Sequence, residues 1–514
     1  MPSLVLGLPR QDSRAARLVS FVAIVGGLAI LRGIFAATID LRVDEAYYWT
    51  WSKESVISYL DHPPLIAWCI RATTFVFGDT NFGVRFTGLA AMLAMQLVQA
   101  DIVRRLLGDG RHVVLAVLLP EASLDYGLGM AKVTPDIALI PFEMAMIWSL
   151  VRLWQSDDLR WWLPAGLFGG LALMSKYTGI LLLPAVLAFA LVPSWRRKHL
   201  ASPWFWCSAL AVLLVISPML YWNATHDWAS FRFQLDRPPQ VDGWSGRFLG
   251  DFLGQQFVMV GVLLLPIAML GTMMMALRGY RGLAPVPILL STAVIFPFAF
   301  FVEHGIDTRV GDSWLLFAWP LGFVCAVLNL KQWNAESRSH LARVAPAVMI
   351  FAIATGVAFV VATELYYIAG TANYLGKDDP IGKEAGFASV VADAEAKRKD
   401  IGAAWFVTTD YRMYSMLRWH LKDEVPVAQI NERARYIGFR EPALDGPVGL
   451  YVAPTYSRQR ALFDNTGAVL ETVGEADLMW RGTRYGGYAL QKLTGWKPEL
   501  SPAPGDAFYV ASPN

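Results

Sequence analysis

Residues 344–363 read VAPAVMIFAIATGVAFVVAT, a run of twenty residues without a charged side chain. About 20 apolar residues are enough for one helix to cross the hydrocarbon core of a bilayer. Similar runs recur along the first two thirds of the chain. We predict eleven spans, at 18–38, 83–103, 112–130, 136–154, 161–175, 178–193, 204–222, 252–277, 285–302, 314–330 and 344–363. The expected fold class is therefore a polytopic α-helical membrane protein.

The composition agrees with this fold class. Charged residues make up 17% of the 514 residues, against roughly 25% in ordinary globular chains. Residues 365–514 hold 35 charged residues in 150, about 23%, whereas residues 1–364 hold 51 in 364, about 14%. The first part is therefore incompatible with a soluble enzyme, a disordered chain or a fibrous protein. The net charge of +2 gives no bulk attraction to nucleic acid, so no nucleic-acid partner is expected.

Short loops between the predicted spans indicate the orientation. One set of loops carries basic residues, namely Arg10, Arg14, Arg17, Arg104, Arg105, Arg111, Arg196, Arg197, Lys198, Arg278, Arg281, Lys331, Arg338 and Arg343. By the positive-inside rule, this side is cytoplasmic. The first span lacks a convincing small-residue cleavage site and is not read as a signal peptide. An odd number of spans then places the C-terminal tail outside the membrane.

The tail has the pattern of a small α/β domain. Residues 403–407 and 448–452 are apolar runs typical of buried strands. Residues 411–421 have helical spacing after Asp410, which is a suitable N-cap. We therefore expect a membrane domain at 1–367, with outer loops at 39–82, 223–250 and 303–313, and a periplasmic α/β domain at 368–514.

The first outer loop contains two acidic pairs, Asp44–Glu45 and Asp61–His62. Charge that leaves a membrane span is costly unless it faces water or substrate, so we expect Asp44 and Glu45 to be functional. The alternative is an ordinary helix start, at which acidic residues interact favourably with the helix dipole. The four aromatic residues between the pairs are interpreted as membrane-interface anchors, namely Tyr47, Tyr48, Trp49 and Trp51.

Three cations break the positive-inside pattern: Lys132, Lys176 and Arg309 all fall on the predicted outer side. Lys176 lies at the break between two short spans, where an unpaired cation would be costly. A lipid phosphate is the expected partner, and a lysine that snorkels to the membrane surface is the alternative. In Lys132-Val-Thr134-Pro135-Asp136, a helix cap is as compatible with the pattern as a functional site.

Other polar residues lie inside the predicted spans. Glu121 and Asp125 are four residues apart and are expected on one face of the third span, looking into one cavity. Glu143 lies well inside the fourth. Such acids usually face the interior of the bundle, and here they either serve the site or pair with structural cations. The histidines His62, His226 and His304 match no metal-ligand spacing, so no metal is predicted, although a divalent cation stays possible. The cysteines Cys69, Cys207 and Cys325 lie in or beside apolar runs and indicate neither a disulfide framework nor a metal site.

Five stretches resemble bacterial membrane glycosyltransferases of the C-type fold, a superfamily that includes aminoarabinose–lipid A transferases, galacturonosyltransferases and protein O-mannosyltransferases. The most specific is Asp44-Glu45-Ala-Tyr47-Tyr48-Trp49 followed by Asp61-His62-Pro63-Pro64. The others are Thr134–Asp136, Ser175–Gly179, Trp222–Trp228 and Gly311–Pro320. The last of these departs from the Trp-Pro-x-Pro pattern of the family, which weakens any role for Asp312.

The resemblance implies a polyprenyl-phosphate-sugar donor, and an acceptor that is lipid A, another glycan or a protein. It places the active site at the periplasmic face of the bacterial inner membrane, with membrane lipids as neighbours. Asp44 matches the catalytic acid position, with Glu45 as its orienter, and the cations Lys176, Arg309 and Lys132 would stabilise the leaving phosphate. One displacement would invert the anomeric carbon, and no cofactor is required. The predicted substrate-binding residues are Tyr47, Asp61, His62, Asp136, Tyr177, His226 and Asp227.

Two other classes of protein stay open at this stage. Eleven helices with intramembrane acids and a broken pair at 161–193 would also suit a transporter or lipid flippase. A non-catalytic assembly subunit would not need the acids and cations of the outer loops. Whether Asp44, Lys176 and Arg309 converge on one cavity distinguishes these alternatives.

Overall fold

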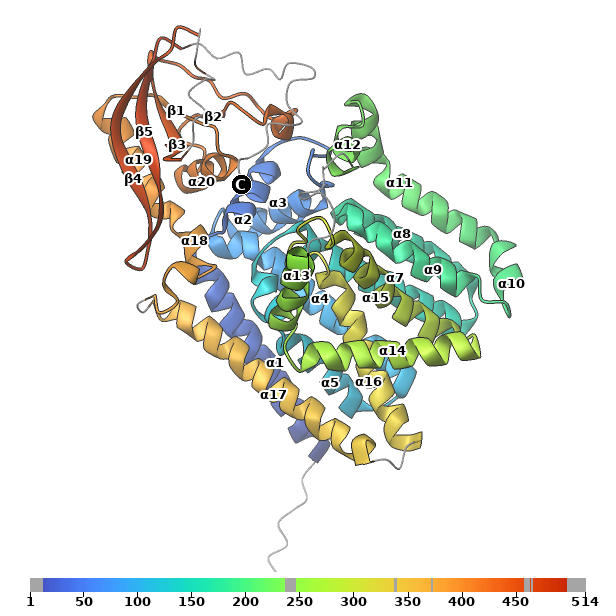
Figure 1. Ribbon diagram of the computed structural model, residues 1–514. Coiled ribbons are helices and arrows are strands. Elements are labelled where there is room, and N and C mark those ends of the chain that lie inside the picture. Colours follow the sequence, from blue (N-terminus) through green and yellow to red (C-terminus); the bar gives the residue numbers. More distant parts are fainter. Residues whose placement is uncertain are drawn as a thin grey trace, which may run out of the picture.

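The computed structural model describes residues 13–235, 246–336, 340–370, 373–456, 463 and 466–496. In this part of the chain, helices extend to Ile368 and a sheet with further helices follows (Figure 1). The α-helices up to that residue are α1 (Ser13–Thr38), α2 (Val43–Lys53), α3 (Leu65–Phe77), α4 (Asn81–Leu107), α5 (Gly110–Glu121), α6 (Leu124–Gly127), α7 (Pro135–Ser156), α8 (Trp162–Ser175), α9 (Leu183–Ala190), α10 (Arg196–Leu200), α11 (Pro203–Thr225), α12 (Ala229–Leu235), α13 (Gly246–Met259), α14 (Leu264–Gly282), α15 (Pro285–His304), α16 (Trp319–Glu336) and α17 (His340–Ile368).

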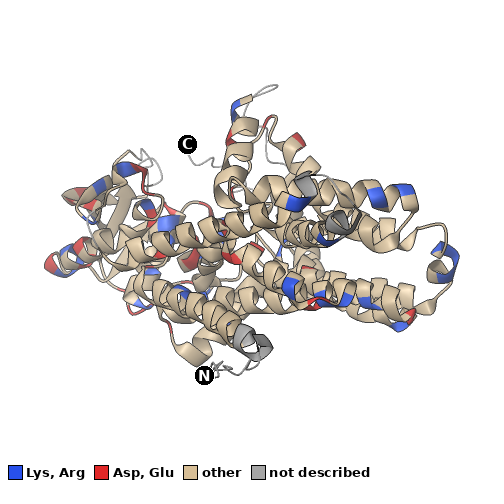
Figure 2. Ribbon diagram, turned by 90° about the horizontal axis from the view of Figure 1, so that it is seen from below, with Lys and Arg blue, Asp and Glu red and all other residues tan. Residues whose placement is uncertain are grey.

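Helices long and apolar enough to cross a membrane coincide with six of the eleven predicted spans. Among the described residues there are six, at Val19–Thr38, Asn81–Leu107, Pro135–Ser156, Pro203–Thr225, Pro285–His304 and Arg343–Ile368. Two bent helix pairs raise this number to eight if each pair is one span. Figure 2 shows long helical stretches with few charged residues, whereas charges gather in the C-terminal part and at helix ends. The predicted total of eleven spans and their orientation stay predictions.

Two predicted spans are not single helices. In the predicted span 252–277, α13 and α14 meet at an angle of 102°. Between them Gly261 adopts a φ of 119°, a backbone conformation that residues with a Cβ atom rarely adopt. In the predicted span 112–130, the helical segments Gly110–Glu121 and Leu124–Ala131 meet at 77°. Pro120 lies in the last turn before this break and cannot donate a backbone hydrogen bond.

The break after α5 separates Glu121 from Asp125, so the expectation that both face one cavity from a single helix is wrong. Glu121 accepts a hydrogen bond from Arg32 of α1 at 2.6 Å and another from Gln96 at 2.6 Å. The Arg32 guanidinium also lies 3.8 Å from Glu364 of α17. Glu121 therefore pairs with a structural cation, which was the alternative interpretation.

Helix α17 packs closely against this break. A Cβ atom at Gly356 would lie 2.2 Å from the carbonyl oxygen of Ala122, so only glycine fits there. Small residues of this kind let helices approach one another in membranes. In Figure 1, α1 and α17 lie side by side along one edge of the helical part.

The C-terminal region, residues 373–496, contains a mixed sheet of five strands in the order β2-β1-β3-β5-β4. Strand β1 pairs in parallel with β2 and β3, whereas β5 pairs antiparallel with β3 and β4. These strands and the main helices are β1 (Trp405–Thr408), β2 (Val427–Gln429), β3 (Val448–Pro454), β4 (Val469–Trp480), β5 (Thr483–Thr494), α18 (Gly382–Ala385), α19 (Phe387–Asp400) and α20 (Tyr411–Leu421). The predicted strands and the Asp410 cap are confirmed, since the Asp410 side chain accepts from the backbone N–H of Arg412.

The alternation of residues along β1 shows that both faces of this sheet are covered by a hydrophobic core. Phe406 packs into a core with Val390 of α19 and Leu417 of α20, whereas Trp405 and Val407 belong to a second core on the other face. Side chains of successive strand residues point to opposite faces, so a run buried throughout must be covered on both sides.

The predicted loop 39–82 is largely helical, because it contains α2 and α3. Of the predicted loop 223–250, α12 occupies Ala229–Leu235, and residues 236–245 lie outside the described residues. The turn predicted at Arg237–Pro239 is among the latter. Helix α2 lies between the membrane helices and α20 of the C-terminal region (Figure 1).

Candidate active site

Helix α2 carries the Asp44–Glu45 pair in its first turn, where negative charge is favourable to the helix dipole. Its aromatic residues are buried: the exposed fraction is 4% for Tyr47, 1% for Trp49 and 0% for Trp51. They pack against α20 in one hydrophobic core. The interpretation of these residues as membrane-interface anchors is therefore wrong, because the C-terminal region covers them.

Glu45 is fully buried and anchors α2 to α4. Its two carboxylate oxygens accept hydrogen bonds from the Arg85 guanidinium at 2.9 and 2.8 Å. They also accept from the backbone N–H groups of Arg42 and Val133, at 2.9 and 3.2 Å. Charge-assisted pairs with two parallel bonds are among the stronger hydrogen bonds in proteins. These contacts are those of an anchor, and a catalytic role for Glu45 stays a prediction.

Asp44 has a different environment from its neighbour. It is half-buried, and among the described residues it makes no ion pair within 4 Å. Burial raises the pKa of Asp44, Lys132 opposes that shift, and the negative charge of Glu384 of α18 adds to it. Asp44 is therefore a carboxylate with a raised pKa that is still partly accessible, and Lys132 is the cation with the largest effect on it.

Lys176 is buried and has a protein partner. Its Nζ lies 2.6 Å from Oδ1 of Asp136, and it also lies 5.6 Å from the centre of the Trp314 ring. Lys176 thus has a protein partner, and its predicted contact with a lipid phosphate stays a prediction. The structure brings together three of the predicted stretches in this contact. The Thr134 hydroxyl donates to the second oxygen of Asp136 at 3.4 Å, and Thr134 itself makes no side-chain cap.

Asp61 joins three parts of the chain. It accepts a hydrogen bond from the Tyr47 hydroxyl at 2.6 Å, and both of its oxygens bind Arg435 of the C-terminal region at 2.6 and 2.7 Å. Its backbone carbonyl accepts from Gln234 of α12 at 2.7 Å. Burial alone would raise the pKa of Asp61, but Arg435 and the Tyr47 hydroxyl outweigh burial and lower it.

The remaining predicted residues differ in their contacts and in their exposure. The ring centres of His62 and Tyr48 are 6.2 Å apart. Tyr177 packs against Phe231 of α12, with ring centres 5.5 Å apart. Arg309 is exposed in the loop after α15.

His226 and Asp227 form the turn between α11 and α12. The His226 ring stacks on Trp222 at 4.4 Å, and its Nδ1 lies 2.7 Å from the carbonyl oxygen of Trp222. Asp227 is exposed, with a φ of 53°. These contacts are local, and the roles of both residues in substrate binding stay predictions.

No group of three or more potential metal ligands occurs among the described residues. Inside the helical part, Asp125 and Glu143 are buried, and no described residue hydrogen-bonds Oδ2 of Asp125 or either carboxylate oxygen of Glu143.

Four residues near the site were not predicted from the sequence: Arg85, Glu384, Tyr411 and Arg435. Arg85 had a detectable signal, because an arginine within the first turns of an apolar helix needs a partner. The other three belong to the C-terminal region, and nothing in their local sequence relates them to residues 42–61.

Comparisons with known proteins bear on the class of enzyme and on the fold. Residues 61–222 match the family described as dolichyl-phosphate-mannose-protein mannosyltransferase. The fold resembles that of ArnT from Cupriavidus metallidurans, crystallised with undecaprenyl phosphate, with a TM-score of 0.63 and 15% identity over 93% of this chain and 98% of that one. The chain is a membrane glycosyltransferase of the C-type fold.

Two relatives of this glycosyltransferase match it over different lengths of the chain. Lipid A galacturonosyltransferase RgtD of Rhizobium johnstonii is 27% identical over 65% of this chain and 71% of its own length. The undecaprenyl phosphate-alpha-4-amino-4-deoxy-L-arabinose arabinosyl transferase of Edwardsiella ictaluri is 31% identical, over 32% of this chain and 30% of its own length. The match to the second relative is therefore confined to a third of either chain.

Proposed function

We propose that this glycosyltransferase moves a sugar from a polyprenyl-phosphate donor to a lipid or glycan acceptor at the periplasmic face of a bacterial inner membrane. In this proposal Asp44 is the general base, and the anomeric carbon is inverted in one displacement. The single observation that carries it is that Asp44 makes no ion pair with a described residue, whereas the predicted carboxylates around it do.

Three acids of the predicted site are paired with cations of the protein itself. The shortest distance between Glu45 and Arg85 is 2.8 Å. It is 2.6 Å between Asp61 and Arg435, and 2.6 Å between Asp136 and Lys176. Asp44 makes no such pair with a described residue. A base must be able to accept a proton, and a carboxylate held by an arginine or lysine resists protonation. Asp44 is thus the best-placed acceptor of a proton.

Three of these acids, Asp44, Asp61 and Asp136, act electrostatically on Tyr48. Burial raises the pKa of the Tyr48 hydroxyl well above its usual value, and the negative charges of Asp44, Asp61 and Asp136 raise it further. The electrostatic effect of three acids from different parts of the chain on one hydroxyl supports a single site. The 2.6 Å pair between Asp136 and Lys176 links the Lys176 break to these acids.

The proposed reaction fits these groups. The acceptor oxygen or nitrogen attacks the anomeric carbon, the bond from that carbon to the phosphate oxygen breaks, and its electron pair stays on the phosphate. The proton of the attacking group passes to Asp44. A raised pKa makes Asp44 a stronger base, and attack on an oxocarbenium-like carbon allows the proton to move late. Lys132 and Lys176 are the nearby cations that would stabilise the phosphate charge.

We propose galacturonic acid as the first sugar to test and lipid A as the first acceptor, because the match to RgtD extends over 65% of the chain. A 4-amino-4-deoxy-L-arabinose donor is the alternative, in keeping with the shorter match. The residues of the site do not by themselves favour a carboxylate or an amine on the sugar.

The test uses the purified full chain in lipid nanodiscs, with each radiolabelled sugar on a polyprenyl phosphate and lipid A as acceptor. Wild type should transfer one of the two sugars with inversion. Asp44→Asn should lower the transfer rate at least about a hundredfold, the usual size of a general-base contribution. Asp477→Asn, which removes one partner of an exposed ion pair on β4, is the matched control and should transfer normally. Wild-type activity in Asp44→Asn would overturn the assignment.

A further inference from the structure

The C-terminal region contacts α2 along its length rather than at one point. The ring of Trp49 lies 5.1 Å from that of Trp419 of α20, and the ring of Tyr47 lies 5.5 Å from that of Tyr411. These residues of α2 and α20 belong to one buried core, apart from Tyr411, which packs against it. The C-terminal region is therefore part of the packing that holds α2, the helix that carries Asp44.

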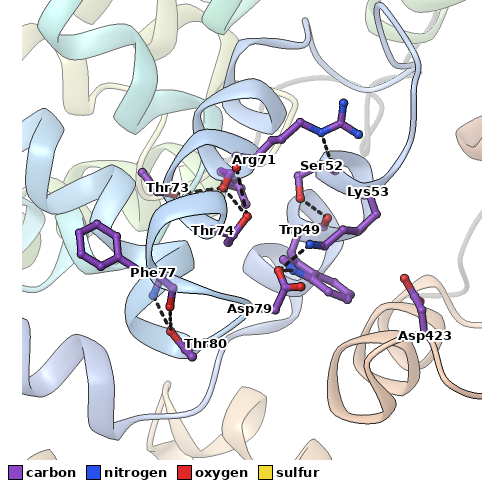
Figure 3. A network of polar contacts seen from close by, with 12 residues as sticks. Trp49, Ser52, Lys53, Arg71, Thr73, Thr74, Phe77, Asp79, Thr80 and Asp423 are labelled. Carbon is purple, nitrogen blue, oxygen red and sulfur yellow. Dashed lines mark hydrogen bonds and ion pairs between the residues drawn. The ribbon is translucent and has the colours of Figure 1, made fainter.

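Polar contacts strengthen the end of α2. Glu54, the residue after α2, forms an ion pair with the Arg418 guanidinium at 3.1 Å and accepts a hydrogen bond from the backbone N–H of Arg440 at 3.1 Å. Figure 3 shows the other polar contacts here, with Trp49 and Lys53 bound to the Asp79 carboxylate and Asp423 on the ribbon opposite. Both ends of α2 are thus fixed, by Glu45 to α4 and by Glu54 to the C-terminal region.

A further contact between the C-terminal region and the surroundings of α2 is made by Arg435. Its guanidinium binds both oxygens of Asp61 and lies between two rings, 5.3 Å from Tyr411 and 5.6 Å from Phe233 of α12. Asp61 in turn accepts from the Tyr47 hydroxyl at 2.6 Å. Tyr47 is three residues after Asp44 and therefore lies on the same face of α2. The rotation of α2 about its own axis is fixed by a chain of contacts that begins in the C-terminal region.

A second residue of the C-terminal region, Tyr411, is the first residue of α20. The negative charge of Asp44 contributes to raising the pKa of the Tyr411 hydroxyl, after the larger effect of burial. The Tyr411 ring also packs on Tyr47. It therefore helps to exclude water from the surroundings of Asp44.

We propose that Arg435 and Tyr411 are positioning residues for the proposed catalytic base. Arg435 sets the orientation of α2 through Asp61 and Tyr47, and Tyr411 limits the access of water to Asp44. The inference rests on the proposed function of Asp44. It makes the C-terminal region part of the support of the catalytic base, beyond a role as a separate folded unit.

The first test compares Arg435→Ala with Arg435→Lys and with Arg484→Ala, which removes an exposed ion pair on β5. Arg435→Ala should lower kcat about ten- to a hundredfold with little change in KM for the donor, since small misplacements of reacting groups cost rates of this order. Arg435→Lys should recover part of kcat, because the charge returns without the planar guanidinium that lies over the rings of Tyr411 and Phe233. Arg484→Ala should behave as wild type. A wild-type kcat in Arg435→Ala would overturn the proposal.

The second test follows the pH dependence of kcat/KM in Tyr411→Ala and Tyr411→Phe. The ionisable groups that face Asp44 are Lys132, Arg42, Glu45, Glu384, Tyr48 and Tyr411. All but Tyr411 are kept in both variants. Water admitted by Tyr411→Ala should lower the pKa of Asp44, so the acid limb of the profile should move to lower pH. Tyr411→Phe keeps the ring and should keep the limb in place. An unmoved limb in Tyr411→Ala would refute the role of Tyr411.

A third measurement does not depend on the choice of substrate. Hydrogen–deuterium exchange of the amides of residues 43–53 should be faster in Arg435→Ala than in wild type or Arg484→Ala, because α2 loses a restraint. Equal exchange in all three proteins would refute the inference. If wild type transferred neither sugar, the proposed function would be refuted, and the exchange comparison would still decide whether Arg435 positions α2.

Discussion

Replacement of Glu45 by glutamine tests whether this residue is primarily an anchor. The side chains of Glu45 and Arg85 have exposed fractions of 0% and 3%, so the variant leaves a buried guanidinium without its countercharge. Arg85 keeps the carbonyl oxygens of Ala36, Ile39 and Asp40 as acceptors. A glutamine can still accept one hydrogen bond from it, whereas the second charge-assisted bond is lost.

Removal of one partner of a buried ion pair typically costs about 3–5 kcal/mol. The remaining acceptors of Arg85 place the expected loss at the lower end, about 3 kcal/mol in the free energy of unfolding. Such a loss corresponds to a roughly hundredfold change in the equilibrium between folded and unfolded protein.

The assay is denaturant titration of the full chain in mixed micelles, with Glu471→Gln as the matched control. Glu471 is an exposed residue of β4, where the same substitution should change the free energy of unfolding by less than about 0.5 kcal/mol. If the two variants are equally stable, the anchoring role of Glu45 is wrong, and a catalytic role becomes the better explanation of its burial.

Three further predictions follow from the remaining ion pairs and from the orientation. Lys176→Ala should weaken binding of undecaprenyl phosphate and Lys176→Arg should restore it only in part, as measured by titration of the lipid; unchanged affinity in the alanine variant would exclude Lys176 from the phosphate site. The lowered pKa of Asp61 gives stability that is present above its ordinary pKa, about 4, and is lost as the pH falls through the lower folded value, so Asp61→Asn should flatten the stability profile in this range while Asp477→Asn should not. A reporter active only in the periplasm should be active when fused after Asn514; activity of a cytoplasmic reporter there would show that the predicted number of spans is wrong by one.

Much of the helical part was predictable because hydropathy is a local property. The runs at 83–103 and 285–302 lie within α4 and α15, and the break at Ser175–Tyr177 does separate α8 from the following 3-10 turn. Bends were not predictable in the same way. The run at 252–277 is apolar throughout its bend, and only the backbone of Gly261 reveals the change of direction.

The site was less predictable, because its residues meet through pairing across the chain. Glu45 and Arg85 are 40 residues apart, as are Asp136 and Lys176, and Asp61 and Arg435 are 374 residues apart. The acids and Lys176 stood out as charges in unfavourable places, whereas Arg85 and Arg435, the partners of Glu45 and Asp61, were not predicted. The aromatic residues of α2 were misinterpreted for a related reason: a membrane-interface anchor and a residue buried by a distant domain have the same local sequence.

The pairing has a consequence for the charge balance of the proposed reaction. With Glu45, Asp61 and Asp136 each paired, Asp44 is left without an ion pair among the described residues, and Lys132 is the cation with the largest effect on it. During transfer Asp44 gains a proton and loses its negative charge, while the departing phosphate gains one. Lys132, which already acts on Asp44, can therefore interact with negative charge both before and after the step. Cations and dipoles that are fixed in place before the reaction stabilise developing charge without the cost of reorganisation. The three ion pairs would thus keep the site rigid and its net charge constant while one negative charge moves from the base to the leaving group.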